Sequence, residues 1–137
     1  MSTVKVNTLT GTSTAGSIAV TGEGNSTTTN LQQGLCKSFG NIELGTTLVE
    51  SFNQSTFTDN GTGDYTFNFT NNMANKNHVT TSNNMRNATG GYGHTAAYGN
   101  SSDTSSTTSS ARQLYTNILN SFEDMRRCMT TTNGDLA

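Results

Sequence analysis

The clearest pattern along the chain is a strict alternation of aromatic and polar residues. Tyr65, Phe67 and Phe69 alternate with Thr66 and Asn68. Because successive side chains of a strand point to opposite faces, this spacing places all three rings on one face and leaves the other face polar. The pattern predicts a strand with one dry side.

The residues just before this strand predict a tight reversal of the chain. Residues 59–64 read DNGTGD, with an Asn-Gly pair and a second glycine, which tolerate positive φ. A strand containing Phe52 and Phe57 precedes them, so we expect a β-hairpin. The loop lacks the lysine and the strand-to-helix context of a phosphate-binding loop. Asp59 and Asp64 are therefore interpreted as turn residues that bond their own backbone.

Apolar residues are sparse before residue 30. The pair Val4 and Val6 shares one face of an extended chain, and so does the pair Ile18 and Val20. We expect two short, edge-like strands there. These pairs, like the Tyr65 strand, have few partners in one chain, so we expect their apolar faces to be shared between subunits.

Two stretches carry helical spacing. Apolar residues at 31, 35 and 39 allow a turn or two of helix, limited by Gly34 and Gly40. In the C-terminal part, apolar residues at 114, 118, 122, 125 and 129 predict an amphipathic helix over residues 111–127. The alternative there is strands, because β-branched residues 130–132 end a helix badly and no glycine caps it. We favour strands.

Residues 71–110 are dominated by Asn, Ser, Thr and Gly, and we expect short strands joined by long exposed loops. Within them, residues 86–100 read RNATGGYGHTAAYGN. Tyrosine beside glycine and asparagine is typical of adaptable recognition loops, because Tyr supplies contact area at a low entropic cost. The receptor-contact candidates are Arg86, Tyr92, His94 and Tyr98. The alternative is that the tyrosines pack at the edge of a sandwich.

Composition favours ordered β-structure over disorder. Thr, Asn, Ser and Gly make up 74 of the 137 residues, and hydrophobic residues only 30%. Disordered chains usually carry high charge and much proline, whereas this one has 12% charged residues, no proline and a net charge of −2. Threonine suits a pleated strand, and Asn and Gly suit the turns between strands. A chain this polar gains stability by pooling its apolar surface in a homo-oligomer.

Charge and hydropathy exclude several classes of partner. The near-neutral balance, with no basic cluster beyond Arg126 and Arg127, argues against nucleic-acid binding. No stretch approaches the length of about 20 apolar residues that spans a bilayer, and the start does not resemble an export signal. We therefore expect no membrane partner.

Candidate chemistry is equally sparse. Cys36 and Cys128 lie far apart and are expected to be buried thiols, with a disulfide as the alternative. His78 and His94 form no His-X-His motif, so we expect surface or loop histidines, no metal and no cofactor. Acidic residues are scattered around turns rather than paired, which predicts that the chain is not an enzyme. They are Glu43, Glu50, Asp59 and Asp64.

Two segments resemble the tail-fibre proteins of marine phages and cyanophages. They are residues 51–77, SFNQSTFTDNGTGDYTFNFTNNMANKN, and residues 133–137, NGDLA. In that family a similar segment opens a small C-terminal β-domain whose last strand runs into a Gly-Asp-Leu-Ala end. The beginning of the chain, residues 1–35, is also similar. Residues 79–110 have no counterpart, and the family's tryptophan near residues 35–42 is absent.

The resemblance implies a homotrimer, and it places Cys128, Thr130 and Thr132 inward on a last strand that starts near Asp124. The expected fold is all-β, with an extended N-terminal strand segment over residues 1–47 for attachment or intertwining. A small antiparallel β-sandwich follows over residues 48–137.

The expected function is that of a virion structural protein, a tail-fibre or short spike subunit for host attachment. It would be made in the host cytoplasm and located in the virion. Its partners would be other tail or capsid proteins and a polysaccharide or protein of the host surface. One alternative is a capsid decoration or head-spike protein. Another is a bacterial surface adhesin, which would need an export signal.

Overall fold

The computed structural model describes residues 3–12, 18–21, 28–43, 47–86, 95–98, 106–117, 119 and 121–137. This part is built almost entirely of β-strands, which confirms the predicted all-β class. The chain divides into two compact units, Met1–Leu35 and Cys36–Ala137. Each unit is described by itself below.

The first unit contains one short hairpin and one helical turn. Strand β1 (Ala19–Thr21) pairs antiparallel with β2 (Thr28–Asn30), and α1 (Leu31–Gly34) follows directly. A strand therefore forms next to Ile18, as expected. No strand forms at Val4 and Val6, whose side chains are 83% and 61% exposed, so that prediction is wrong. An extended segment without a neighbouring strand has no ladder hydrogen bonds to hold it.

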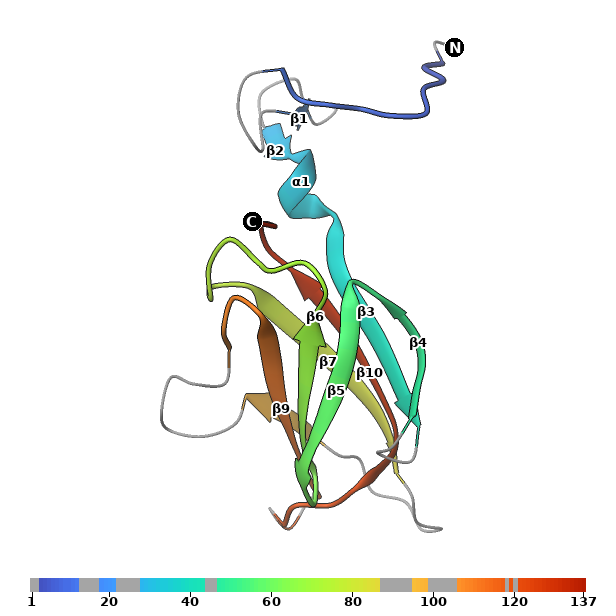
Figure 1. Cartoon of the computed structure of the whole chain (residues 1–137), viewed down its shortest axis with the longest axis vertical. Coiled ribbons are helices and arrows are strands. Elements are labelled where there is room, and N and C mark those ends of the chain that lie inside the picture. Colours follow the sequence, from blue (N-terminus) through green and yellow to red (C-terminus); the bar gives the residue numbers. More distant parts are fainter. Residues whose placement is uncertain are drawn as a thin grey trace. The chain divides into compact units, whose positions relative to one another are not determined.

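The second unit is a sandwich of two four-stranded antiparallel sheets (Figure 1). The first sheet has the order β4-β3-β10-β7, formed by β3 (Cys36–Glu43), β4 (Thr47–Phe52), β7 (Val79–Arg86) and β10 (Met125–Asn133). The second has the order β5-β6-β9-β8, formed by β5 (Gln54–Gly61), β6 (Asp64–Phe69), β8 (Thr95–Tyr98) and β9 (Ser110–Thr116). The sandwich thus begins at Cys36 rather than at residue 48, because β3 pairs with β10 in the middle of the first sheet.

The core lies between the two sheets and is centred on the aromatic strand. Tyr65 and Phe67 of β6 are buried, and Phe69 is buried with Met73 and Ala111 in a smaller cluster. The larger cluster also contains Ile42, Tyr115, Met125 and Cys128. One face of β6 is therefore dry, as predicted, but it is covered by the chain's own first sheet. The expectation that this face lacks partners within one chain is wrong.

The C-terminal part forms strands, as we favoured, and its described residues form no helix where the apolar spacing also allowed one. β9 and β10 span most of residues 110–133. Cys128, Thr130 and Thr132 are all buried, which confirms the inward alternation that the resemblance implied. Asp124 directly precedes the first residue of β10. Long-range pairing of β10 with both β3 and β7 therefore prevails over the local helical spacing.

The predicted hairpin forms from β5 and β6, but Phe52 and Phe57 do not share a strand. The chain leaves the first sheet at Phe52 and enters the second at Gln54. Asn53 at this corner has φ 53°, a region that asparagine tolerates better than most residues. Its amide nitrogen donates to the carbonyl oxygens of Lys37 at 3.0 Å and Asn71 at 3.1 Å, which holds the corner in place.

Hydrogen bonds at Gly63 join the hairpin turn to the end of β9 and to the segment that follows it. This residue has φ 66°, its N–H donates to Asp124 Oδ1 at 2.8 Å, and its carbonyl accepts from Tyr115 N at 2.8 Å. A Cβ atom at this position would lie 2.5 Å from the Tyr115 carbonyl oxygen. Neither the backbone conformation nor the space admits a side chain.

We therefore expect Gly63→Ala to lower the free energy of unfolding by about 1–3 kcal/mol, as measured by urea denaturation. Gly34→Ala is the control, because a Cβ atom there meets no atom within 4 Å and its φ is not positive. Equal free energies of unfolding for the two variants would show that the contacts at Gly63 do not stabilise the turn.

Candidate functional site

The structure describes the expected receptor-contact residues only in part. Tyr92 and His94 lie outside the described residues, and only the backbone is described for Arg86 and Tyr98. Tyr98 pairs in register with Gln113, whose side chain is buried. The choice between receptor contact and packing at the edge of the sandwich stays a prediction for these residues.

A set of side chains that sequence analysis did not single out lies on the outer face of the second sheet. In register, Thr56 is opposite Asn68 and Thr58 is opposite Thr66, and the next strand places Arg112 beside Thr66. Thr66 and Asn68 alternate with the buried residues of β6, and Arg112 alternates with those of β9. We call this set the Asn-Thr array; its members are Thr56, Thr58, Asn60, Asp64, Thr66, Asn68 and Arg112.

Two asparagine amides connect the threonines of the array. Nδ2 of Asn68 donates to Oγ1 of Thr56 at 3.1 Å and of Thr58 at 3.2 Å. Nδ2 of Asn60 donates to Oγ1 of Thr66 at 2.9 Å and to Oδ1 of Asp64 at 3.2 Å. Each amide thus uses both of its hydrogens within the array. The side chains are held in a fixed arrangement on a solvent-exposed sheet face.

One ion pair closes the array. Nε of Arg112 donates to Oδ1 of Asp64 at 2.8 Å, and Nη2 donates to Oδ2 of the same carboxylate. The hydrogen bond from Arg112 lowers the pKa of Asp64 below its usual value, so the pair stays ionised and the two charges cancel. Asp64 is therefore not the turn residue that we expected. Asp59 is one, since its Oδ1 accepts from Gly61 N at 2.9 Å.

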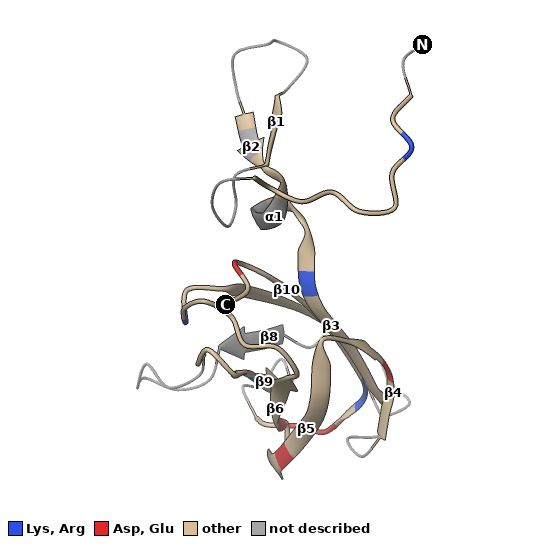
Figure 2. Ribbon diagram, turned by 45° about the horizontal axis from the view of Figure 1, so that its top comes forward, with Lys and Arg blue, Asp and Glu red and all other residues tan. Residues whose placement is uncertain are grey.

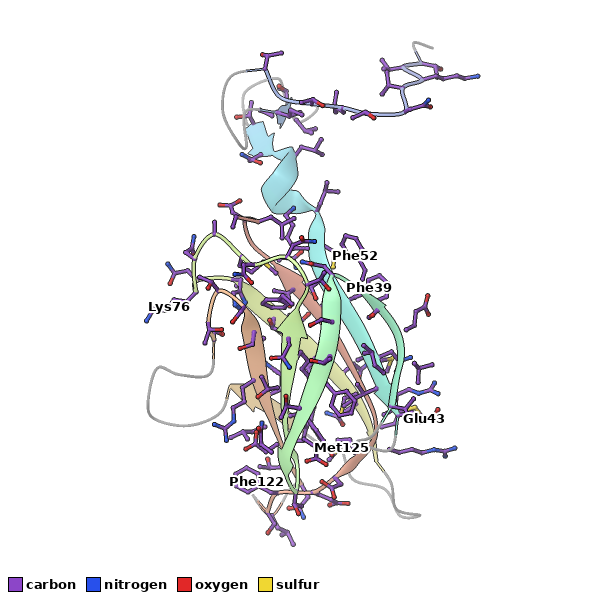
Figure 3. All side chains as sticks on the ribbon, viewed as in Figure 1. Phe39, Glu43, Phe52, Lys76, Phe122 and Met125 are labelled. Atoms are coloured by element: carbon purple, nitrogen blue, oxygen red, sulfur yellow. The ribbon has the colours of Figure 1, made fainter. Side chains whose placement is uncertain are left out.

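The outer face of the first sheet has a different character. Phe39 and Phe52 stack there with ring centroids 6.1 Å apart (Figure 3), and Phe52 is half-exposed. Val79 and Met85 of β7 are also exposed. The one ion pair that the described residues form on this face joins Arg127 and Glu43 at 3.2 Å. Charged residues are few over the described part of the sandwich (Figure 2), so the two faces differ mainly in the exposed apolar side chains that the first sheet adds to its hydroxyl groups.

The sandwich interior also contains polar groups. Nε2 of Gln54 donates to Oγ1 of Thr130 at 3.2 Å, and Gly40 leaves the space that the Gln54 side chain fills. Thr80 and Thr132 hydrogen-bond through their hydroxyls at 2.9 Å. The Gln54–Thr130 hydrogen bond connects the two sheets, and the Thr80–Thr132 hydrogen bond joins neighbouring strands of the first sheet. All four side chains are buried, so we assign them a structural role.

The histidine and cysteine predictions are partly corrected. His78 lies in a loop, as expected, but it is buried edge-on against Phe69 with ring centres 5.3 Å apart. Its Nε2 lies 2.9 Å from the Thr107 carbonyl oxygen, which only accepts, so Nε2 carries the proton. Both cysteines are free thiols, but only Cys128 is buried and Cys36 is exposed. Among the described residues, no group of three or more His, Cys, Asp or Glu side chains could hold a metal ion.

Three ionisable groups of the core are held in their neutral forms. Burial raises the pKa of the Cys128 thiol to about 12. Burial also raises the pKa of Tyr115, and burial followed by the charge of Asp124 raises that of Tyr65. A thiol that remains protonated is a poor nucleophile, so Cys128 is an inert core residue.

Comparison with known proteins finds no matching family, no matching curated protein and no matching solved structure. No helix in the described ranges is long and apolar enough to cross a membrane.

Proposed function

We propose that this chain is a non-enzymatic structural subunit of a bacteriophage particle, a tail fibre or short spike that displays its sandwich for host attachment. The observation that carries the proposal is the difference in exposed apolar surface between the two outer faces. The first sheet exposes Phe52, Val79 and Met85, whereas the second exposes the Asn-Thr array. A display subunit needs one face for assembly and another for contact with its target. The resemblance of residues 51–77 and 133–137 to phage tail fibres supports the virion setting.

The assembly partner in this proposal is a second copy of the chain. The first sheet has four antiparallel strands, so its edge strands β4 and β7 run in opposite directions. A rotation about an axis parallel to the strands would therefore bring β7 of one copy beside β4 of the next as an antiparallel neighbour. Such head-to-tail contacts close into rings. The resemblance favours a ring of three.

Both edges of the first sheet lack the usual protection of an exposed edge. β4 carries a single charge, Glu50, and β7 carries none before its last residue, Arg86. Neither strand contains proline or lysine, the residues that commonly block pairing with another chain. Pairing between copies would cover these edges together with Phe52 and Met85.

We expect the purified protein to sediment as a stable homotrimer at micromolar concentration. Phe52→Glu should shift it to a folded monomer, because a carboxylate would replace a half-exposed ring at the contact. Thr56→Glu is the matched control, since it places the same charge on the outer face of the second sheet and should leave the trimer intact. A folded monomer for the unmodified protein would overturn the assembly part of the proposal.

The virion setting is tested by immunogold electron microscopy of assembled particles. Label on the tail supports a fibre or spike. Label spread over the capsid lattice would instead identify a decoration protein. Label on the bacterial surface, without particles, would identify an adhesin.

A further inference from the structure

We propose that the Asn-Thr array is a binding surface for a neutral, hydroxyl-rich polysaccharide. The inference rests on the proposed attachment function and names the class of target and the residues that contact it. The earlier prediction for Tyr92 and His94 is unaffected, because these residues lie outside the described residues.

The hydrogen-bonding capacity of the array points outward. The hydroxyl oxygens of Thr56, Thr58 and Thr66 accept the asparagine amides, so each hydroxyl keeps its own hydrogen as a donor for a ligand. Asn68 uses both N–H groups inside the array, which leaves its amide oxygen as an acceptor. The face thus offers both donors and acceptors. Sugar hydroxyls both donate and accept, and they match such a face.

The array is ordered before any ligand arrives. Each of its threonines is tied to an asparagine, and Asp64 and Arg112 hold each other through two hydrogen bonds. Binding to side chains that are already fixed avoids part of the entropic cost of ordering them. Neighbouring strands repeat at about 4.8 Å, so the face presents equivalent groups in a regular row that suits a repeating polymer.

Charge selects a neutral target over an anionic one. Arg112 is the sole cation of the array, and Asp64 neutralises it. The Arg112 side chain is still about one-third exposed, so its remaining N–H groups can donate to a sugar oxygen without creating a net positive site. An anionic polymer would meet the carboxylate of Asp64 without a surplus of positive charge. We therefore expect binding that depends little on salt.

Affinity for one site should be modest, because the array itself contains no aromatic ring to stack on a sugar. A ring of three subunits would present three copies to the same polymer. Linked sites raise the overall affinity without any new contact, by increasing the effective concentration of the second site.

The test is a titration of the full-length protein with printed oligosaccharides and soluble polymers, with dextran and galactomannan as neutral probes and alginate as the anionic probe. We expect binding to at least one neutral probe. Thr58→Val removes one hydroxyl at nearly constant volume and should weaken that binding at least tenfold. Thr56→Val is a second, independent removal on the same face and should act in the same direction.

Thr81→Val is the matched control, because Thr81 pairs with Thr131 at 2.7 Å between hydroxyls on the exposed face of the other sheet. It should leave glycan binding unchanged. Sedimentation and urea denaturation confirm that each variant remains folded and assembled. Equal binding by Thr58→Val and Thr56→Val, a preference for alginate, or binding to no neutral polymer would overturn the inference.

Failure of the inference is distinguishable from failure of the proposed function. A protein found on virions that binds no neutral polymer refutes the glycan surface alone. A protein that binds neutral polymers through the array but is absent from particles refutes the virion role alone. Recovery of a host protein whose capture is abolished by Thr58→Val would assign the array to a protein receptor and also overturn the inference.

Discussion

Phe67→Ala is expected to lower the free energy of unfolding by about 3–5 kcal/mol. The Phe67 side chain is 0% exposed and lies in the centre of β6, between the two sheets. Without the ring, the protein loses the free energy gained by burying it. A cavity also remains among Ile42, Tyr65 and Tyr115, and it cannot collapse fully because strands on both sides fix the positions of these residues. A domain of this size has a total stability of roughly 5–15 kcal/mol. The substitution should therefore lose most of the folded protein.

The matched control for this prediction is Phe122→Ala. Phe122 is 54% exposed and lies outside the core clusters, in the segment between β9 and β10. Its removal should change the free energy of unfolding by less than about 0.5 kcal/mol. Urea denaturation followed by tyrosine fluorescence measures both variants. A loss of less than 1 kcal/mol for Phe67→Ala would show that this ring is not the core residue that its position indicates.

The elements with strong local signals were predictable from the sequence. Alternation at Tyr65, Phe67 and Phe69 identified a strand and its buried face, and the glycines at 61 and 63 identified the turn. Threonine-rich residues 130–132 gave a weaker signal, because a helical spacing competed with it in the same stretch. Only the pairing of β10 with two other strands decides between them, and that pairing is non-local.

The corner at Asn53 shows why element boundaries were harder to predict. The segment from Leu48 to Gly61 contains no proline or glycine before its end, so nothing in the pattern marks a break. One residue with φ 53° is enough to move the chain from one sheet to the other. The same non-local geometry placed β3 inside the sandwich, since its pairing partner β10 lies at the other end of the chain.

The Asn-Thr array was also beyond the reach of sequence patterns. The alternation of polar residues predicts a solvent-facing side for β6, but it does not indicate which residues of the neighbouring strands lie on the same face. Register supplies that information, because it sets Thr58 opposite Thr66 and Thr66 opposite Arg112. The signal that was available is the alternation of Thr and Asn at positions 56, 58 and 60 and again at positions 66 and 68.

The second large effect expected is alkaline unfolding driven by the core. Tyr65 and Tyr115 pack with ring centroids 5.8 Å apart, and the Tyr115 hydroxyl lies 2.7 Å from Ser82 Oγ. Cys128 belongs to the same cluster. All three are acids whose pKa values are raised by burial in the folded protein. The folded state therefore keeps protons that the unfolded state releases.

Stability should be unaffected by these groups at neutral pH and should fall as the pH rises above the ordinary pKa values, 9.0 for the thiol and 10.0 for the phenols. A group that is ionised only in the unfolded state contributes a slope of at most about 1.4 kcal/mol per pH unit, so the decline should begin with the thiol and steepen above pH 10 as the phenols join it. Urea midpoints measured from pH 7 to 11 test this. Cys128→Ala should remove the first part of the decline, near pH 9, and leave the tyrosine part. A midpoint that stays constant up to pH 11 would mean that these side chains can ionise in the folded protein and that the core is open to water.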